Sequence, residues 1–166
     1  MSLVYRKIKT QVGTLKLVAN SKALVAILWG DEKRVKLGSM KKDVSNAILA
    51  ETEKQLAEYF DGKRKTFSIP LEATGTEFQN QIWKELRRIP YGKTISYLEL
   101  AKKMGRPKGA RAAGMATGKN PISILVPCHR VIGADGRLTG FAGGISAKKT
   151  LLQLEAASRS KGIRSG

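Results

Sequence analysis

The first 30 residues show the two-residue hydrophobic period of β-strands. Leu15, Leu17 and Ala19 share one face of an alternating segment, and residues 23–29 form an apolar run after a polar turn. Successive side chains of a strand point to opposite faces of a sheet, so this pattern indicates strands with one buried face. We therefore expect antiparallel strands between residues 3 and 30.

The rest of the first half mixes loop, helix and strand patterns. Residues 31–42 are polar and favour a loop, whereas apolar residues recur at helical spacing over 44–60, where Asp61-Gly62 ends the helix. Residues 66–71 favour a last strand, and a linker follows it. No catalytic constellation occurs in this half, so residues 1–74 are expected to form a structural α/β domain.

The hydrophobic period changes to that of a helix after residue 75. Thr76 and Gln79 have the spacing of a capping box, in which each side chain bonds the other residue's backbone N–H. The apolar residues of this segment lie on one helical stripe: Phe78, Ile82, Trp83, Leu86 and Ile89. We expect these aromatic side chains to lie in a core and not to stack on nucleic-acid bases.

Two short helices are expected next. Ser96 and Glu99 form a second capping-box pattern, and this helix ends at Gly105, since glycine readily takes the left-handed conformation of a helix end. A second helix fits residues 108–118. Two short helices joined by a glycine-containing turn resemble a helix-turn-helix, although any helical hairpin gives the same spacing.

The second helix of this pair has few large side chains. Alanine and glycine occupy most of residues 110–118, with Arg111 as the long side chain near the start. Such a helix can closely approach another surface, which is either a second helix or the wall of a nucleic-acid groove. Arg111 is correspondingly a phosphate ligand, a plug inserted into a base stack, or an ordinary surface arginine.

The net charge of +18 indicates a polyanionic partner. Residues 91–166 contain 14 Lys and Arg against 3 Asp and Glu, and seven bases but no acid lie between Glu99 and Asp135. Nucleic acid is the simplest polyanion that fits. A solvated basic surface is the alternative, and it is the preferred interpretation for scattered lysines such as Lys33, Lys36, Lys41 and Lys42.

The single cysteine and the single histidine of the chain, Cys128 and His129, are adjacent. An apolar run at 122–126 favours a buried extended segment that Pro127 ends, so Cys128 is expected in a turn with backbone N–H groups nearby. Such groups, with His129 and Arg130, favour the thiolate, which is the nucleophilic form. Adjacent residues do not share a face of a helix or strand, so a water can mediate between the two side chains. The alternative is an inert buried cysteine.

The sequence excludes several classes of protein. One cysteine allows no internal disulfide, and one cysteine with one histidine cannot form a structural zinc site. No apolar run approaches the ~20 residues of a membrane span, and the N-terminus lacks the apolar core of a signal peptide. We expect a soluble protein of the reducing cytoplasm.

A series of motifs resembles one known family. They are Ile-Pro-Tyr-Gly (89–92), Ser-Tyr (96–97), Arg-Ala-Ala-Gly (111–114), Asn-Pro (120–121), Pro-Cys-His-Arg-Val (127–131) and Gly-Phe-Ala-Gly-Gly (140–144). Together they resemble the O6-alkylguanine-DNA alkyltransferases, closely over residues 75–156 and more loosely before them.

The resemblance implies an α+β fold. A small N-terminal antiparallel sheet with a helix would be followed by a mainly helical C-terminal domain, residues 75–157, with a helix-turn-helix. A basic tail, residues 158–166, continues past the match and is expected to be disordered.

The resemblance also implies a reaction: DNA repair by one irreversible transfer of an alkyl group from O6-alkylguanine, and from O4-alkylthymine, to Cys128. His129 would act as a base through a water, and Glu155 would orient His129. Asn120 would tie the second helix of the pair to the active-site turn. The pocket for the base would be formed by Val131, Phe141 and Ala142, together with the backbone of Cys128.

On the DNA side, Arg111 would fill the base stack after the damaged nucleotide is rotated out, because a stacked guanine hides its O6 substituent from in-line attack. Tyr97 would crowd the 3′ phosphate and so favour that rotation. Further DNA contacts are implied for Leu98, Arg106 and Ala134. The implied partner is double-stranded DNA carrying O6-alkylguanine, bound by a monomer without a cofactor, a metal or a membrane.

The chain departs from the family at Phe141, where the family usually has tyrosine. Phenylalanine keeps the ring as a wall of the pocket but lacks the hydroxyl that is thought to help protonate the leaving guanine. We expect the same reaction with an altered rate or lesion preference, unless the Ala142 N–H or a water takes over.

Three other functions fit parts of the sequence. A lesion sensor related to the alkyltransferases would bind the damaged base without repairing it, but such sensors lack the acceptor cysteine. A transcription factor would use the helix pair, yet no dimerisation element or set of base-reading side chains is evident. A cysteine hydrolase would need an acyl pocket and oxyanion donors, which the sequence neither shows nor excludes.

Overall fold

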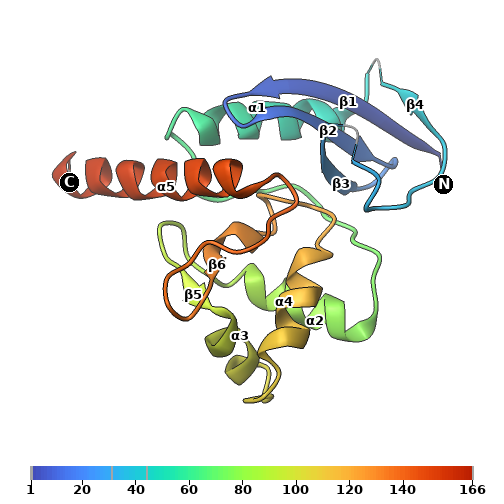
Figure 1. Ribbon diagram of the computed structural model, residues 1–166. Helices are drawn as coiled ribbons and strands as arrows, with labels where there is room; N and C mark the ends of the chain where they lie inside the picture. Colours follow the sequence, from blue (N-terminus) through green and yellow to red (C-terminus); the bar gives the residue numbers. More distant parts are fainter. Residues whose placement is uncertain (1, 31, 44, 166) are drawn as a thin grey trace. The chain divides into compact units, whose positions relative to one another are not determined.

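The computed structural model describes residues 2–30, 32–43 and 45–165, with the backbone alone described for residues 159–165. The chain divides into two compact units. The first comprises Met1–Thr74 and Pro121–Ser123, and the second comprises Gly75–Asn120 and Ile124–Gly166. Their helices and strands are labelled in Figure 1.

The first unit is built on a four-stranded sheet with the order β3-β2-β1-β4. Strands β1 (Leu3–Thr10), β2 (Gly13–Ala19) and β3 (Leu24–Trp29) are antiparallel neighbours, which confirms the expected strands. Strand β4 (Met40–Lys42) pairs in parallel with β1. The loop expected over 31–42 is therefore wrong at its end, because these residues add to the free edge of β1.

Helix α1 (Ala47–Phe60) covers one face of this sheet (Figure 1). It begins where Asn46 caps it, since the Asn46 side chain accepts a hydrogen bond of 2.9 Å from the Leu49 N–H. The start expected at Val44 lies outside the described residues. Tyr59 on the inner side of α1 is fully buried, so the helix supplies much of the core of this unit.

The strand expected over 66–71 is wrong. Only Leu71 in this segment forms an isolated bridge to the sheet. Pro70 has no N–H to donate, and the Ser68 N–H bonds the side chain of Gln55 at 3.0 Å. Backbone bonds from this segment to β3 occur on either side of Leu71, and at Ser68 a side-chain partner replaces the backbone ladder that a strand would need.

The outer edge of β3 is paired with residues from much later in the chain. The Ile27 N–H donates to the carbonyl oxygen of Pro121 at 2.9 Å, and the indole N–H of Trp29 donates to Ser123 Oγ at 3.0 Å. The first contact satisfies a backbone group that would otherwise be open at the sheet edge, and the second adds a bond between side chains.

The second unit is mainly helical. Its elements, in chain order, are α2 (Glu77–Leu86), β5 (Ile95–Ser96), α3 (Tyr97–Lys103), α4 (Ala110–Gly118), the 3₁₀ turn η1 (Cys128–Arg130), β6 (Val131–Ile132) and α5 (Ile145–Ser165). Strands β5 and β6 pair in parallel. A sheet with a helix followed by a helical unit confirms the α+β class.

Both capping boxes expected from the sequence are present. Thr76 and Gln79 bond each other's backbone N–H at the start of α2, and Ser96 and Glu99 do the same at the start of α3. Each box satisfies two of the donors that a helix start leaves open. The local sequence therefore fixes where these two helices begin.

Helices α3 and α4 form the expected helix pair. Gly105, just after α3, has a φ of +74°, the left-handed conformation expected of it. A Cβ added to Gly114 of α4 would lie 3.4 Å from Cδ1 of Tyr97, so the small residue permits close approach of α3. Trp83 of α2 is 4% exposed and donates its indole N–H to Ala116 O, which confirms its place in the core.

The extended segment expected over 122–126 is instead a turn with isolated bridges. Ile124 has a φ of +76°, a conformation that a β-branched residue rarely adopts and that costs about 1–3 kcal/mol. The neighbouring residues are buried, so packing imposes this turn against local preference.

Helix α5 continues to Ser165, through most of the tail expected to be disordered. The side chains of residues 159–165 and all of Gly166 lie outside the described residues, so the disorder of the tail stays a prediction. Within the part of the chain that is described, no helix combines the length and apolar character needed to cross a membrane.

Candidate active site

Cys128 begins the 3₁₀ turn that follows the buried turn at 121–126. Pro127 has backbone angles of −80° and 65°, which end the preceding segment, and the Cys128 N–H bonds the carbonyl oxygen of Val126 at 2.8 Å. The cysteine is 7% exposed. The cysteine is therefore a buried residue at the start of a short turn.

His129 and Glu155 form a buried pair. The imidazole Nε2 lies 2.7 Å from Oε2 of Glu155, and the two residues are 0% and 1% exposed. The other ring nitrogen, Nδ1, is buried and has no hydrogen-bond partner in the described part of the chain. An ionised carboxylate can only accept, so Nε2 carries the proton and Nδ1 is left as an acceptor.

Arg130 completes this cluster. Its Nε and one terminal nitrogen donate to the two oxygens of Glu155 at 2.9 and 3.1 Å, and its other terminal nitrogen donates to Ile89 O at 2.7 Å. The N–H of Gly92 adds a longer bond of 3.3 Å to Glu155. The carboxylate thus has donors on both oxygens, and its negative charge is matched by the guanidinium.

The protonation states follow from these contacts. Burial raises the pKa of Glu155, but the hydrogen bonds from His129 and Arg130 outweigh it and hold that pKa at about 2. Burial lowers the pKa of His129, and the charges of Arg130 and Lys148 lower it further against the opposing effect of Glu155. At neutral pH the cluster therefore contains an ionised Glu155 and a neutral His129 that can accept a proton.

Lys148 is a buried cation that the sequence interpretation missed. It is 0% exposed, and its Nζ donates to Val131 O at 2.7 Å and to Thr139 O at 3.4 Å. Burial lowers the pKa of Lys148. The negative charge of a Cys128 thiolate acts against that shift, so the two groups interact electrostatically. Helical spacing could have revealed it, since Lys148, Leu151 and Glu155 lie on one buried stripe of α5.

Asn120 connects the end of α4 to the active-site turn. Its side-chain Nδ2 donates to Val126 O at 2.8 Å, and the residue is 1% exposed. The bond crosses the turn that contains Ile124 and reaches the residue two positions before Cys128. The contact expected of Asn120 is thus present.

The residues expected to contact DNA lie on the surface of the second unit. Arg111, Arg106 and Ala134 are exposed, and Leu98 is 38% exposed. The Arg106 guanidinium lies 4.8 Å from the centre of the Phe78 ring. Met115 is 66% exposed one turn after Arg111, so the face of α4 that carries Arg111 also presents an apolar side chain, which the sequence interpretation did not single out.

Tyr97, the first residue of α3, contacts the loop before α5. Its hydroxyl accepts a hydrogen bond of 3.0 Å from Thr139, and Lys148 Nζ lies 5.9 Å from the centre of its ring. Farther along the same loop, Phe141 is partly buried and Ala142 is exposed. The structure thus brings Tyr97, Val131 and Lys148 together through this loop and α5.

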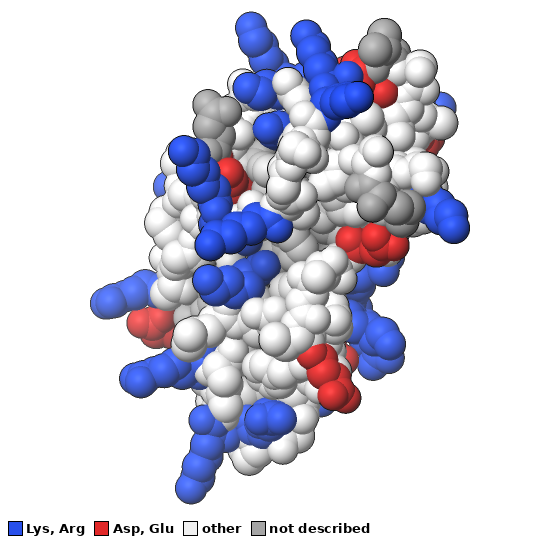
Figure 2. Space-filling view, turned by 90° about the vertical axis from the view of Figure 1, so that its right-hand side faces the viewer, with Lys and Arg blue, Asp and Glu red and all other residues white. Residues whose placement is uncertain are grey.

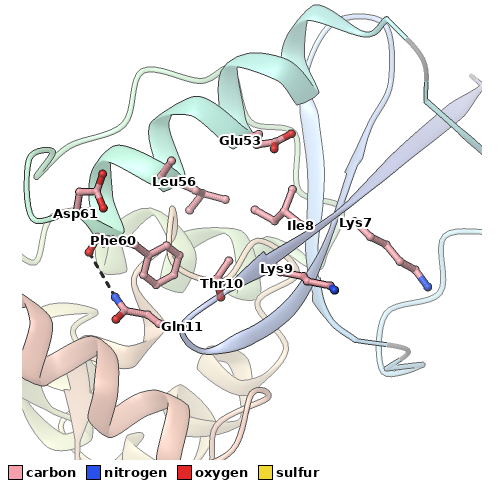
Figure 3. A pocket seen from close by; sticks show the side chains of 10 residues that line it. Lys7, Ile8, Lys9, Thr10, Gln11, Glu53, Leu56, Phe60 and Asp61 are labelled. Carbon is pink, nitrogen blue, oxygen red and sulfur yellow. Dashed lines mark hydrogen bonds between the residues drawn. The ribbon is translucent and has the colours of Figure 1, made fainter.

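No group of three or more histidine, cysteine or acidic side chains able to hold a metal ion occurs among the described residues. A pocket of about 620 Å³ lies in the first unit, between β1 and α1, with Ile8, Leu56 and Phe60 as its apolar lining (Figure 3). None of the sequence-predicted site residues lines it.

Positive charge dominates the surface. Lysine and arginine side chains are spread over the face shown in Figure 2, where acidic side chains form only small patches. The acid-poor stretch of the sequence contributes exposed lysines and arginines on and around α3 and α4, among them Lys102, Lys103, Arg106, Lys108, Arg111 and Lys119.

Two models of one protein family together match most of the chain. The model of the 6-O-methylguanine DNA methyltransferase ribonuclease-like domain matches residues 3–73, and that of the DNA binding domain matches residues 77–157. The methylated-DNA--protein-cysteine methyltransferase of Methanosarcina mazei is 43% identical over 154 residues, which are 92% of this chain and 97% of that protein.

Two solved structures are similar to this chain over most of its length. The Mycobacterium tuberculosis O6-methylguanine methyltransferase has 41% identity and a TM-score of 0.86, with 94% of each chain covered. A crystal structure of Mycobacterium tuberculosis OGT in complex with DNA has 41% identity and a TM-score of 0.87, with 93% of this chain and 94% of that chain covered.

Proposed function

Because the chain belongs to the 6-O-methylguanine DNA methyltransferase family, we propose that Cys128 takes the alkyl group from O6 of a guanine in duplex DNA. The chain is a DNA-repair enzyme that works by alkyl transfer to a protein cysteine, and Cys128 is its only cysteine. The same reaction on O4-alkylthymine belongs to this proposal.

The observation that carries the assignment is the buried acceptor nitrogen beside the cysteine. Nδ1 of His129 has no partner within the described residues, while Glu155 holds Nε2 in the protonated form. A water at Nδ1 would take the proton of the Cys128 thiol and pass it to the imidazole. Glu155, itself held by Arg130, is the positioning residue that fixes the tautomer.

In the chemical step one S–C bond replaces one C–O bond. The Cys128 sulfur attacks the alkyl carbon, an S–C bond forms, and the C–O6 bond breaks with its electron pair passing to the guanine. The proton that left the thiol is returned to the guanine, which leaves as the normal base. A thioether offers no route back to the thiol, so each molecule acts once.

The base must leave the stack before this attack. Extrusion costs a few kcal/mol, and Arg111, exposed near the start of α4, would offset part of that cost by filling the gap. The small residues of α4 suit the narrow minor groove, which limits sequence readout. Tyr97 would crowd the 3′ phosphate, and Leu98, Arg106 and Ala134 would contact the DNA strands.

The extruded base would lie against the turn and the loop before α5. We assign Val131, Phe141 and Ala142 to its pocket, with Asn120 holding the turn in place from α4. Phe141 supplies a ring without a hydroxyl, so assistance to the leaving guanine would fall to the Ala142 N–H or to a water. The chain would act as a monomer in the cytoplasm, where a free thiol stays reduced.

The test is the mass of the Cys128 peptide. The protein is incubated with a duplex containing one O6-methylguanine and digested, and the peptide is weighed. We expect one added methyl group per molecule, and none in Cys128→Ala, which should still bind the duplex nearly as well. An unmodified Cys128 peptide from a protein that binds the lesion tightly would overturn the proposal and indicate a sensor.

The role of Arg111 has its own test. Arg111→Ala should slow transfer from the duplex by about tenfold or more, because part of the extrusion cost is no longer offset. Transfer from free O6-alkylguanine base should hardly change. Single-turnover rates on both substrates measure this, with Lys119→Ala at the other end of α4 as the matched control. Equal losses on duplex and free base would exclude the plug.

A further inference from the structure

The sheet of the first unit has two faces that differ sharply in charge. Arg6 of β1 points toward α1, where it bonds Glu53 of the helix. Ile8 lines the pocket between β1 and α1, which Lys7 and Lys9 also border. Side chains alternate along a strand, so Tyr5, Lys7 and Lys9 belong to the opposite face. Figure 3 agrees, since Ile8 points toward Leu56 of α1 while Lys7 and Lys9 point away.

The strand register assembles the lysines of three strands on this second face. Residues that pair directly lie on the same side of a sheet, and Lys16 of β2 is paired with Lys7 while Lys42 of β4 is paired with Tyr5. Lys16 Nζ lies 4.4 Å from the centre of the Tyr5 ring. We call the residues Tyr5, Lys7, Lys9, Thr14, Lys16 and Lys42 the lysine face.

No acidic residue occupies a position of the lysine face. On β1, β2 and β4 the remaining residues of that side are Leu3, Val18 and Met40, which pack into an apolar cluster with Tyr5, Val35 and Leu37. The apolar half is covered by the loop before β4, whereas Lys9, Thr14 and Lys42 are exposed. The lysine face is therefore open and acid-free at its strand positions.

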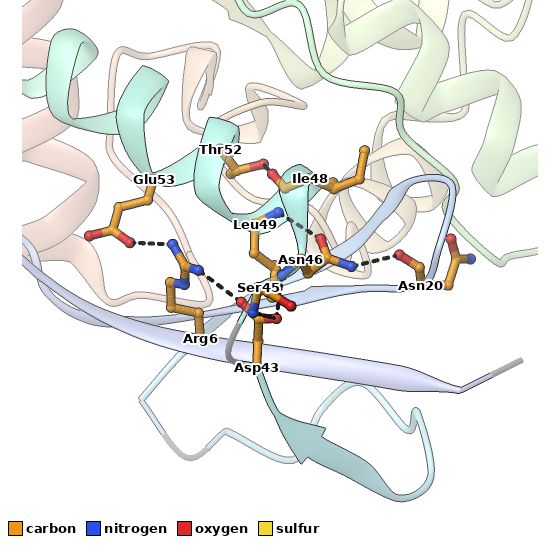
Figure 4. Close-up of polar contacts among 9 residues, drawn as sticks. All are labelled: Arg6, Asn20, Asp43, Ser45, Asn46, Ile48, Leu49, Thr52 and Glu53. Carbon is orange, nitrogen blue, oxygen red and sulfur yellow. Dashed lines mark hydrogen bonds and ion pairs between the residues drawn. The ribbon is translucent and has the colours of Figure 1, made fainter.

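The arrangement of the lysine face includes a repulsion between like charges. Lys7 and Lys16 are directly opposite on neighbouring strands, and like charges at such positions destabilise a sheet. On the face of the sheet that α1 covers, by contrast, Arg6 forms ion pairs with both Asp43 and Glu53 (Figure 4). A bound polyanion would lower the repulsion between these two lysines.

We propose that the lysine face is a second nucleic-acid contact, which binds the phosphate backbone of duplex DNA without reading its sequence. The inference rests on DNA being the partner of the proposed function, but it concerns a unit to which no DNA contact was assigned. Lysines supply the charge, and the exposed Thr14 hydroxyl supplies a neutral contact typical of backbone binding. Its effect would be stronger, salt-dependent retention on undamaged DNA.

The salt dependence of binding tests this directly. The full-length triple variant Lys9→Gln, Lys16→Gln, Lys42→Gln is compared with the charge-matched control Lys22→Gln, Lys54→Gln, Lys63→Gln, whose lysines are exposed elsewhere on the same unit. Each phosphate contact contributes about 0.9 to the slope of log K against log salt. We expect the slope on undamaged duplex to fall by about 2 to 3 in the first variant and by less than about 1 in the control.

A second measurement uses the unaltered protein. Acetylation of lysines is compared with and without undamaged duplex, and Lys9, Lys16 and Lys42 should lose reactivity while Lys22, Lys54 and Lys63 keep it. Equal slopes in the two triple variants, or equal reactivity with and without DNA at the lysine face, would overturn the proposal. Transfer from free O6-alkylguanine should be unchanged in both variants, so failure of the proposed alkyl transfer would be visible separately.

Discussion

Two polar clusters in this protein are each built around one arginine that bonds a carboxylate, and they differ in burial. In the first unit Arg6 bonds Asp43 at 2.8 Å and Glu53 at 3.0 Å (Figure 4). In the second unit Arg130 bonds both oxygens of Glu155, which also bonds His129. Each cluster joins residues far apart in the chain through one arginine and its carboxylate partners.

The two clusters differ in how far their side chains are buried and in the ring nitrogen Nδ1 of His129. The Arg6 and Glu53 side chains are 25% and 46% exposed, so water screens their charges. Glu155 and His129 are almost fully buried, and Nδ1 of His129 is left without a partner among the described residues. The first cluster joins α1 to the sheet, whereas the second leaves a ring nitrogen of His129 able to accept a proton, next in sequence to Cys128.

The largest expected effect is on the free energy of unfolding, when a glutamate of each cluster is replaced by glutamine. Glu155→Gln leaves Arg130 buried without a counter-charge and should lower the free energy of unfolding by about 3–5 kcal/mol. Glu53→Gln, the matched control in the exposed cluster, should cost about 1 kcal/mol or less. Urea unfolding of both variants measures this.

The same two variants also differ in chemistry. In Glu155→Gln a neutral amide replaces the carboxylate and no longer fixes His129 with a protonated Nε2. Single-turnover transfer should therefore slow in the folded fraction of this variant and be unchanged in Glu53→Gln. A Glu155→Gln protein as stable and as fast as the parent would remove the distinction between the clusters.

A smaller effect concerns pH. The pKa of His129 is lowered from 6.5, chiefly by burial, so the neutral base persists below pH 6.5. Transfer from free O6-alkylguanine should hold its rate through pH 6.5 and fall only as the pH drops through the lowered value, by about tenfold per unit. The stability contributed by the neutral ring is likewise present above pH 6.5 and lost as the pH falls through the lowered pKa.

The pH–rate profile of single-turnover transfer measures this, with urea unfolding at each pH as the control for loss of fold. An inflection at or above pH 6.5 would contradict the burial of a neutral His129 as the origin of the base.

The smallest effect is expected for Arg6→Gln. The variant loses the partly exposed ion pair to Glu53 on α1 and the ion pair to Asp43, whose side chain is 4% exposed, and should lower stability only modestly. The rate of alkyl transfer should be unchanged, because the cluster touches no residue assigned to the reaction. Thermal unfolding together with the single-turnover rate checks both expectations, and a slower transfer step would connect the exposed cluster to catalysis.

Local signals in the sequence identified a large part of the fold. The capping boxes at Thr76 and Ser96 fixed two helix starts because their bonds join residues three apart. The alternation at Leu15, Leu17 and Ala19, with the apolar run at 23–29, indicated antiparallel strands between residues 3 and 30. Segments without such signals were misjudged, such as 66–71, where a side chain 13 positions away takes the backbone bond.

What the sequence determined by itself was the pair Cys128 and His129, the helix pair that carries Arg111, and an excess of positive charge. These follow from identity, short-range spacing and composition. Only the tertiary structure decided that Lys148 is buried, that Ile124 adopts a left-handed turn, and that lysines from three strands share one face. Each of these depends on packing or pairing between residues distant in the chain, which local periodicity does not encode.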